Sequence, residues 1–92
     1  MDLQDLRIKI DSIDNELIRL FEERLVVAAD IAKYKKLHNK PVFDPVREEQ
    51  KLNDIMSKVK EDHKEYISDF FLVLFKISRM EQEKILNTRG AV

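Results

Sequence analysis

Apolar residues recur at alternating intervals of four and three positions along the first third of this 92-residue chain. One arginine interrupts the series, which we call the seam and which consists of Leu6, Ile10, Ile13, Leu17, Leu20, Arg24, Val27 and Ile31. This alternation is the heptad pattern of a helix that packs along its length against another helix. It predicts a single helix over residues 3–38, with Asp2 as its N-cap and a length of about 50 Å.

Two interruptions divide the rest of the chain. Pro41 disfavours helix in the residue before it, and Asp44-Pro45 supplies an N-cap acid followed by proline at the first helical position. The predicted boundaries are 45–60 for a second helix, 64–87 for a third and 88–92 for a frayed tail. One glycine and two prolines leave little material for turns, so we expect an all-α fold with residues 1–92 in one domain.

The first predicted helix is longer than the domain that contains it. A compact chain of this length has a radius of gyration of about 12–13 Å, so a helix of about 50 Å extends past the remaining structure. The seam covers almost the whole helix, and its overhanging part needs an apolar partner. The simplest symmetric solution is a second copy, which predicts an intertwined helical homodimer.

The overall composition excludes several classes of function. The net charge of −1 provides no field that would attract nucleic acid. The chain has no cysteine, and neither His38 nor His63 has the spacing of a metal ligand, so we expect no metal and no cofactor. The longest strongly apolar run, Phe70–Phe75, is too short to cross a membrane, and the N-terminus lacks a signal-peptide core, so we predict a cytoplasmic protein.

Polar residues occupy inward positions on all three predicted helices. Arg24 and Lys35 lie three turns apart on one face of the first helix, and Ser78 and Gln82 are an i, i+4 pair on the third. Glu48 shares the apolar face of the second helix with Leu52, Ile55 and Val59. Because a buried charge needs a partner, cations, an amide, a hydroxyl and a carboxylate in one helical core are typical of a pocket for a small dianion.

Each of these residues also has an alternative interpretation without a ligand. Arg24 would pair with an acid of a neighbouring helix, and Lys35 would extend to water near the helix C-terminus. Ser78 would be a small residue at a helix contact and Gln82 a solvated amide. Asp44 and Glu48 in the first turn would serve as cap and dipole partners, and these alternatives stay open on spacing alone.

The charged residues recur at specific intervals inside the apolar frame. The segments that carry this combination are Leu6-Arg7-x-x-Ile10-Asp11-x-Ile13-Asp14, Glu23-Arg24, Ile31-Ala32-x-x-Lys35 and Pro41-Val42-x-Asp44-x-x-Arg47-Glu48. In these segments the chain resembles the all-helical class of chorismate mutases, and the resemblance extends over its whole length. It implies a three-helix protomer in an intertwined dimer with two equivalent sites. No second domain follows before Val92, so we expect a monofunctional protein.

The resemblance also implies an activity and a set of site residues. Proteins of this class rearrange the dianion chorismate to prephenate in the biosynthesis of phenylalanine and tyrosine. The implied substrate-binding residues are Arg7, Arg24, Lys35, Asp44, Arg47, Glu48, Ser78 and Gln82. Lys35, Gln82 and Arg24 have the implied catalytic roles. Because Arg7 lies about 25 Å along the helix from Arg24, we expect it to enter the site of the partner protomer.

Two other functions fit the same sequence. A lyase that removes pyruvate from isochorismate would use a similar clamp of cations. A non-enzymatic helical module, in which the seam only dimerises, would tolerate loss of Arg24 and Lys35.

Overall fold

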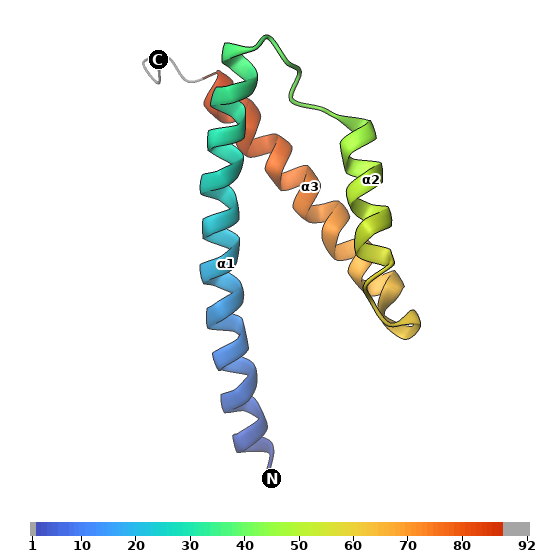
Figure 1. Cartoon of the computed structure of the whole chain (residues 1–92). Helices are drawn as coiled ribbons and strands as arrows, with labels where there is room; N and C mark the ends of the chain where they lie inside the picture. The colour runs from blue at the N-terminus through green and yellow to red at the C-terminus, as the bar shows by residue number, and fades with distance from the viewer. Residues whose placement is uncertain (1, 88–92) are drawn as a thin grey trace.

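The chain forms three α-helices and one short 3₁₀ turn in the computed structural model, which describes residues 2–87 (Figure 1). The elements in chain order are α1 (Leu3–Leu37), α2 (Pro45–Met56), the 3₁₀ turn η1 (Glu61–His63) and α3 (Lys64–Leu86). Residues 2–87 contain no β-strand, which confirms the predicted all-α class. The frayed tail predicted for 88–92 lies outside the described residues.

Helix α1 runs without interruption for 35 residues. A capping box fixes its start: the Asp5 N–H donates to the Asp2 carboxylate at 2.9 Å, and the Asp2 N–H donates to the Asp5 carboxylate at 3.5 Å. These bonds satisfy donors that have no partner inside the helix. The molecule is 54 Å long, and the N-terminal half of α1 extends beyond the other helices (Figure 1).

The C-terminal end of α1 reverses the chain toward α2. Asn39 has a φ of 54°, the left-handed conformation that asparagine tolerates after a helix end. The Lys40 N–H donates to the Lys35 carbonyl at 2.8 Å and the Asn39 N–H to the Lys36 carbonyl at 3.4 Å, which is the Schellman pattern. The turn brings the Val42 carbonyl within 2.7 Å of the Lys35 ammonium.

Helix α2 begins as Asp44-Pro45 predicts. The Asp44 side chain accepts a hydrogen bond from the Arg47 N–H at 3.0 Å, and Pro45 occupies the first helical turn, where its missing N–H costs nothing. This cap fixes the backbone at the entrance to the helix. It therefore positions the first turn, which carries Arg47 and Glu48.

Helix α2 ends at Met56, four residues before the predicted boundary at position 60. The Ser57 hydroxyl donates to the Asp54 carbonyl at 2.6 Å and replaces the backbone donor that a further turn would supply. The Lys58 ammonium donates to the Asp54 carboxylate at 2.8 Å, and this hydrogen bond lowers the pKa of that carboxyl group below its usual value. The apolar spacing predicted Val59 on the inward face of α2. In the structure Val59 lies instead in the turn that follows α2.

Helix α3 packs against both other helices, whereas α1 and α2 make no close backbone approach to each other over the described residues (Figure 1). The buried residues of α1 are Ala28 and Ala32, whose small side chains allow another helix to approach closely. Ile55 of α2 and Leu74 and Phe75 of α3 are the other buried apolar residues. Helices α1 and α2 therefore stand apart, and α3 packs against both of them on one side of the space between them.

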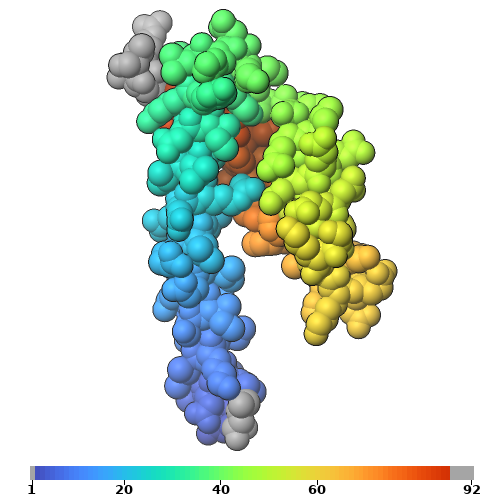
Figure 2. Space-filling model, viewed as in Figure 1, coloured from blue at the N-terminus to red at the C-terminus, as the bar shows by residue number. Residues whose placement is uncertain are grey.

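The N-terminal half of the seam remains exposed in the single chain. Its five apolar members expose between 45% and 55% of their surface; they are Leu6, Ile10, Ile13, Leu17 and Leu20. The chain exposes 7598 Å² in total, against about 5,600 Å² for a compact monomer of this mass. Figure 2 shows this half of α1 standing clear of the other helices. Packing among residues 2–87 of one chain therefore leaves this half of the seam without a partner.

Candidate active site

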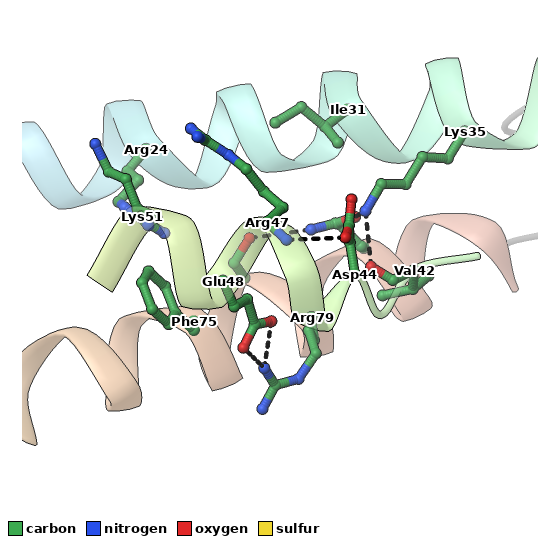
Figure 3. A pocket seen from close by; sticks show the side chains of 12 residues that line it. Arg24, Ile31, Lys35, Val42, Asp44, Arg47, Glu48, Lys51, Phe75 and Arg79 are labelled. Atoms are coloured by element: carbon green, nitrogen blue, oxygen red, sulfur yellow. Dashed lines mark hydrogen bonds and ion pairs between the residues drawn. The ribbon is translucent and has the colours of Figure 1, made fainter. Parts of the chain in front are cut away.

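A cavity of about 320 Å³ lies between α1 and α2, and α3 forms its floor (Figures 2 and 3). Seven of the eight predicted site residues line it, namely Arg24, Lys35, Asp44, Arg47, Glu48, Ser78 and Gln82. All three helices thus contribute polar side chains to one space. The eighth predicted residue, Arg7, is an exposed side chain near the N-terminal end of α1 and does not line the cavity.

A chain of hydrogen bonds joins α1 to α3 at the base of the cavity. The Lys35 ammonium donates to the Gln82 side-chain oxygen at 2.9 Å, and the Gln82 amide nitrogen donates to the Ser78 hydroxyl at 3.1 Å. Gln82 is only 5% exposed. Because an ammonium group cannot accept a hydrogen bond, Lys35 determines which way the amide points. The NH₂ end of Gln82 therefore faces Ser78, and the oxygen faces Lys35.

Lys35 also fixes the segment between α1 and α2. Its ammonium donates to the Val42 carbonyl at 2.7 Å, and its own carbonyl accepts the Lys40 N–H in the Schellman turn. The side chain is half-buried. Of its three N–H donors, hydrogen bonds within the described residues use two, so one donor remains for a ligand.

The upper part of the cavity is rich in cations. Arg24 makes a long hydrogen bond of 3.5 Å to the Leu74 carbonyl, so its guanidinium retains most of its donors. Figure 3 shows Arg47 and Lys51 extending from α2 toward α1. Arg24, Arg47 and Lys51 are spaced around one opening, and none of them forms an ion pair with a carboxylate of residues 2–87. Such an arrangement favours a ligand with more than one negative charge.

One ion pair crosses the floor of the cavity. The Arg79 guanidinium donates to both oxygens of the Glu48 carboxylate, at 2.6 and 2.5 Å, and both side chains are about one quarter exposed. Asp44 is the only other carboxylate among the lining residues. Five cations face these two carboxylates, which gives the lining a formal charge of +3; the cations are Arg24, Lys35, Arg47, Lys51 and Arg79.

Five residues that line the cavity were not predicted from the sequence as site residues: Ile31, Val42, Lys51, Phe75 and Arg79. Lys51 lies one helical turn after Arg47, and that i, i+4 spacing was a signal for a second cation on the same face. Arg79 directly follows Ser78, but neighbouring positions on a helix are about 100° apart, so spacing gave no reason to include it. Val42 contributes through its backbone carbonyl, which no side-chain pattern reveals.

The described residues contain neither a metal-binding cluster nor a membrane-spanning helix. Between residues 2 and 87, no group of three or more His, Cys, Asp or Glu side chains is placed to hold a metal ion. None of the helices α1 to α3 is both long enough and apolar enough to span a membrane.

Comparison with known proteins gave one family and several relatives. The sequence model described as chorismate mutase type II matches residues 6–83. The chain is 39% identical over 61 residues to a chorismate mutase of Methanocaldococcus jannaschii. The matched segment is 66% of this chain and 61% of that protein. It is 32% identical over 83 residues to a bifunctional chorismate mutase/prephenate dehydratase of Escherichia coli. That matched segment is 88% of this chain and 22% of the relative. No solved structure gives a significant match.

A third relative, the T-protein of Haemophilus influenzae, is 48% identical over 46 residues, which is 50% of this chain and 12% of that protein. The chain therefore spans between about one tenth and three fifths of the length of these three relatives. The family match, in contrast, extends from the first turn of α1 to the last turn of α3.

Proposed function

Because this chain belongs to the chorismate mutase type II family, we propose that it converts chorismate to prephenate in aromatic amino-acid biosynthesis. One observation carries the proposal: a cavity with a formal charge of +3 contains an amide that a lysine has already oriented. A dianion is the ligand that such a cavity favours. The direct test is conversion of chorismate by the purified protein, with the product identified.

The proposed reaction requires no group transfer from the protein. Chorismate rearranges intramolecularly: an ether C–O bond breaks while a C–C bond forms, and no proton changes place. Catalysis therefore depends on holding the substrate in its reactive chair-like conformation and on stabilising the charge that develops in the transition state. Both tasks suit a rigid helical site whose polar groups are fixed before the substrate binds.

The cations of the cavity suit the two carboxylates of the substrate. Arg24 offers a planar fork of donors that matches a carboxylate, and Arg47 offers a second fork from α2. Lys35 and the Ser78 hydroxyl lie at the base of the same space. Two anchoring points at a fixed separation would hold the conformer that places the reacting carbons together.

Lys35 and Gln82 have N–H donors that can meet the ether oxygen of the substrate. Negative charge accumulates on this oxygen as the C–O bond breaks. That oxygen has only lone pairs and must be met by donors. Lys35 retains one N–H donor beyond those bonded to Gln82 and Val42, and the Gln82 amide retains one N–H beyond that bonded to Ser78. We assign these two donors to the ether oxygen. The ring hydroxyl then needs an acceptor, which the carboxylates of Glu48 and Asp44 would provide at the start of α2.

We further propose that the protein acts as an intertwined homodimer in which each site receives Arg7 from the partner protomer. The exposed half of the seam supplies the interface, because five large apolar side chains at heptad spacing favour pairing with an identical helix. Arg7 is on the same exposed half of α1, about 25 Å from Arg24. The excess of about 2,000 Å² of surface over a compact monomer supports an interface of the obligate kind. A cytoplasmic location stays a prediction.

Replacing Gln82 with glutamate should make the activity depend on pH. At pH 7–8 an ionised carboxylate would present no donor to the ether oxygen and would repel the dianion, so we expect kcat/KM to fall by about 10²-fold or more. Activity should rise as the pH falls toward the ordinary pKa of a glutamate, about 4.3, because the protonated acid again donates. Steady-state rates between pH 4.5 and pH 8 measure this effect.

The matched control is Gln82→Met, which removes the donor and has nothing to titrate. We expect it to be slow across the same pH range, with no recovery in acid. A Gln82→Glu protein with the rate and pH profile of the parent would show that Gln82 does not meet the ether oxygen.

A further inference from the structure

Arg79 is the residue of the cavity whose contacts the proposed mechanism leaves unexplained. Its guanidinium nitrogen Nη1 donates to both Glu48 oxygens, so a group on α3 holds a carboxylate on α2. Both side chains are partly buried, at 30% and 25% exposure, where an ion pair is screened less than at the surface. The pair therefore links α2, which forms one wall of the cavity, to α3, which forms its floor.

A second contact holds the guanidinium from another direction. The carbon at its centre lies 5.2 Å from the middle of the Phe43 ring, a cation–π distance. Phe43 belongs to the segment between α1 and α2, directly after Val42, whose carbonyl Lys35 holds. Arg79 thus contacts both sides of the cap residue Asp44: Phe43 before it and Glu48 after it.

The charges around Glu48 show what this arrangement prevents. Four other cations line the same cavity, and a Glu48 carboxylate released from Arg79 would be attracted toward them. Any of those cations that paired with Glu48 would no longer be available to a substrate carboxylate. Figure 3 shows the Glu48 carboxylate meeting Arg79 on the side away from α1, where Arg24 and Lys35 originate.

We infer that Arg79 is a positioning residue, which holds the Glu48 carboxylate against α3 so that Glu48 accepts from the ring hydroxyl of the substrate and does not neutralise the cations that bind its carboxylates. The inference rests on the proposed function. Arg79 does not itself touch the substrate in this account. Its contribution passes through Glu48, and it should therefore vanish when Glu48 carries no charge.

A double-mutant cycle tests this dependence. In the parent protein, Arg79→Met should lower kcat/KM for chorismate about tenfold or more, chiefly through a higher KM, because the released Glu48 competes with the substrate for cations. In a Glu48→Gln background the same replacement should change kcat/KM by less than about twofold. Arg79→Lys should restore most of the activity, because a single nitrogen of Arg79 makes both contacts and an ammonium can replace it.

Two control variants separate the ion pair from other effects of the substitution. Phe43→Leu removes the ring under the guanidinium and leaves the pair, and Lys76→Met removes an exposed cation one turn earlier on α3. Lys76→Met should stay within about twofold of the parent. Phe43→Leu should lower kcat/KM less than Arg79→Met does, because the Glu48 contacts of Arg79 remain. If Arg79→Met is not folded by circular dichroism, Arg79→Gln takes its place in the cycle.

The outcomes distinguish this inference from the proposed function. Three results would overturn the role of Arg79: an equal loss of kcat/KM from Arg79→Met in both backgrounds, no loss in either background, or a loss in Phe43→Leu as large as in Arg79→Met. The proposed function would still stand in these cases, provided that the parent protein converts chorismate. A parent protein that leaves chorismate unchanged would instead overturn the proposed function, and this inference with it.

Discussion

Replacing Lys35 with methionine should lower kcat/KM for chorismate by about 10²- to 10³-fold, the usual cost of removing one preorganised donor from a transition state. Lys35 has a second function that increases the loss, because it orients the Gln82 amide and holds the Val42 carbonyl. Without the ammonium, the amide oxygen of Gln82 loses its donor and the amide is free to turn. Two donors to the ether oxygen would thus be affected by one substitution.

Lys33→Met is the matched control for this experiment. Lys33 is an exposed cation two residues earlier on α1, and it does not line the cavity. Its removal changes the net charge by the same amount, so we expect parental kinetics. If Lys35→Met and Lys33→Met both kept the parental rate, the assignment of the Lys35 donor to the ether oxygen would be wrong.

Mixing two inactive variants should restore activity if the sites are shared between protomers. Arg7→Ala removes the cation proposed to come from the partner, and Lys35→Ala removes one that a site receives from its own chain. In a mixed dimer one site then has both lesions and the other has neither. Because half of the dimers in an equal mixture are mixed, we expect about one quarter of the parental activity after exchange, from two preparations that are each nearly inactive.

The control is to prove exchange independently, with a tag on one variant and co-purification of the other. Sedimentation should give a dimer for each variant, since Arg7 and Lys35 are not members of the apolar seam. Proven exchange without recovery would contradict the shared site. A monomer of full activity would contradict the dimer itself.

Local rules predicted the helix starts well. Asp2 and Asp44 act as N-caps in the structure, and their side chains accept the backbone donors that such residues ordinarily accept. The end of α2 was harder to predict, because it depends on a hydroxyl of Ser57 that bonds a particular carbonyl. The apolar spacing continues to Val59 and therefore predicted a longer helix. That spacing contains no information on whether a side-chain hydroxyl will replace a backbone N–H as the donor to a carbonyl.

Periodicity predicted five of the twelve residues that line the cavity, namely Arg24, Lys35, Glu48, Ser78 and Gln82, whereas the family resemblance implied Asp44 and Arg47. Arg24 and Lys35 were identified because they interrupt an apolar face, and the structure brings them to the same cavity as Ser78 and Gln82. Arg79 was missed because its partner is 31 positions away in the sequence and on another helix. Pairing of that kind depends on how α2 and α3 pack, which no single-helix pattern contains.

Incubation of the purified protein with chorismate, with substrate and product followed by proton NMR, is the most direct test of the proposed mutase activity. We predict that chorismate disappears, that prephenate appears in equal amount, and that Lys35→Met is at least about 10²-fold slower under the same conditions. Isochorismate offered in parallel should release no pyruvate. A folded dimeric protein that leaves chorismate unchanged, or that instead releases pyruvate from isochorismate, would contradict the proposed function.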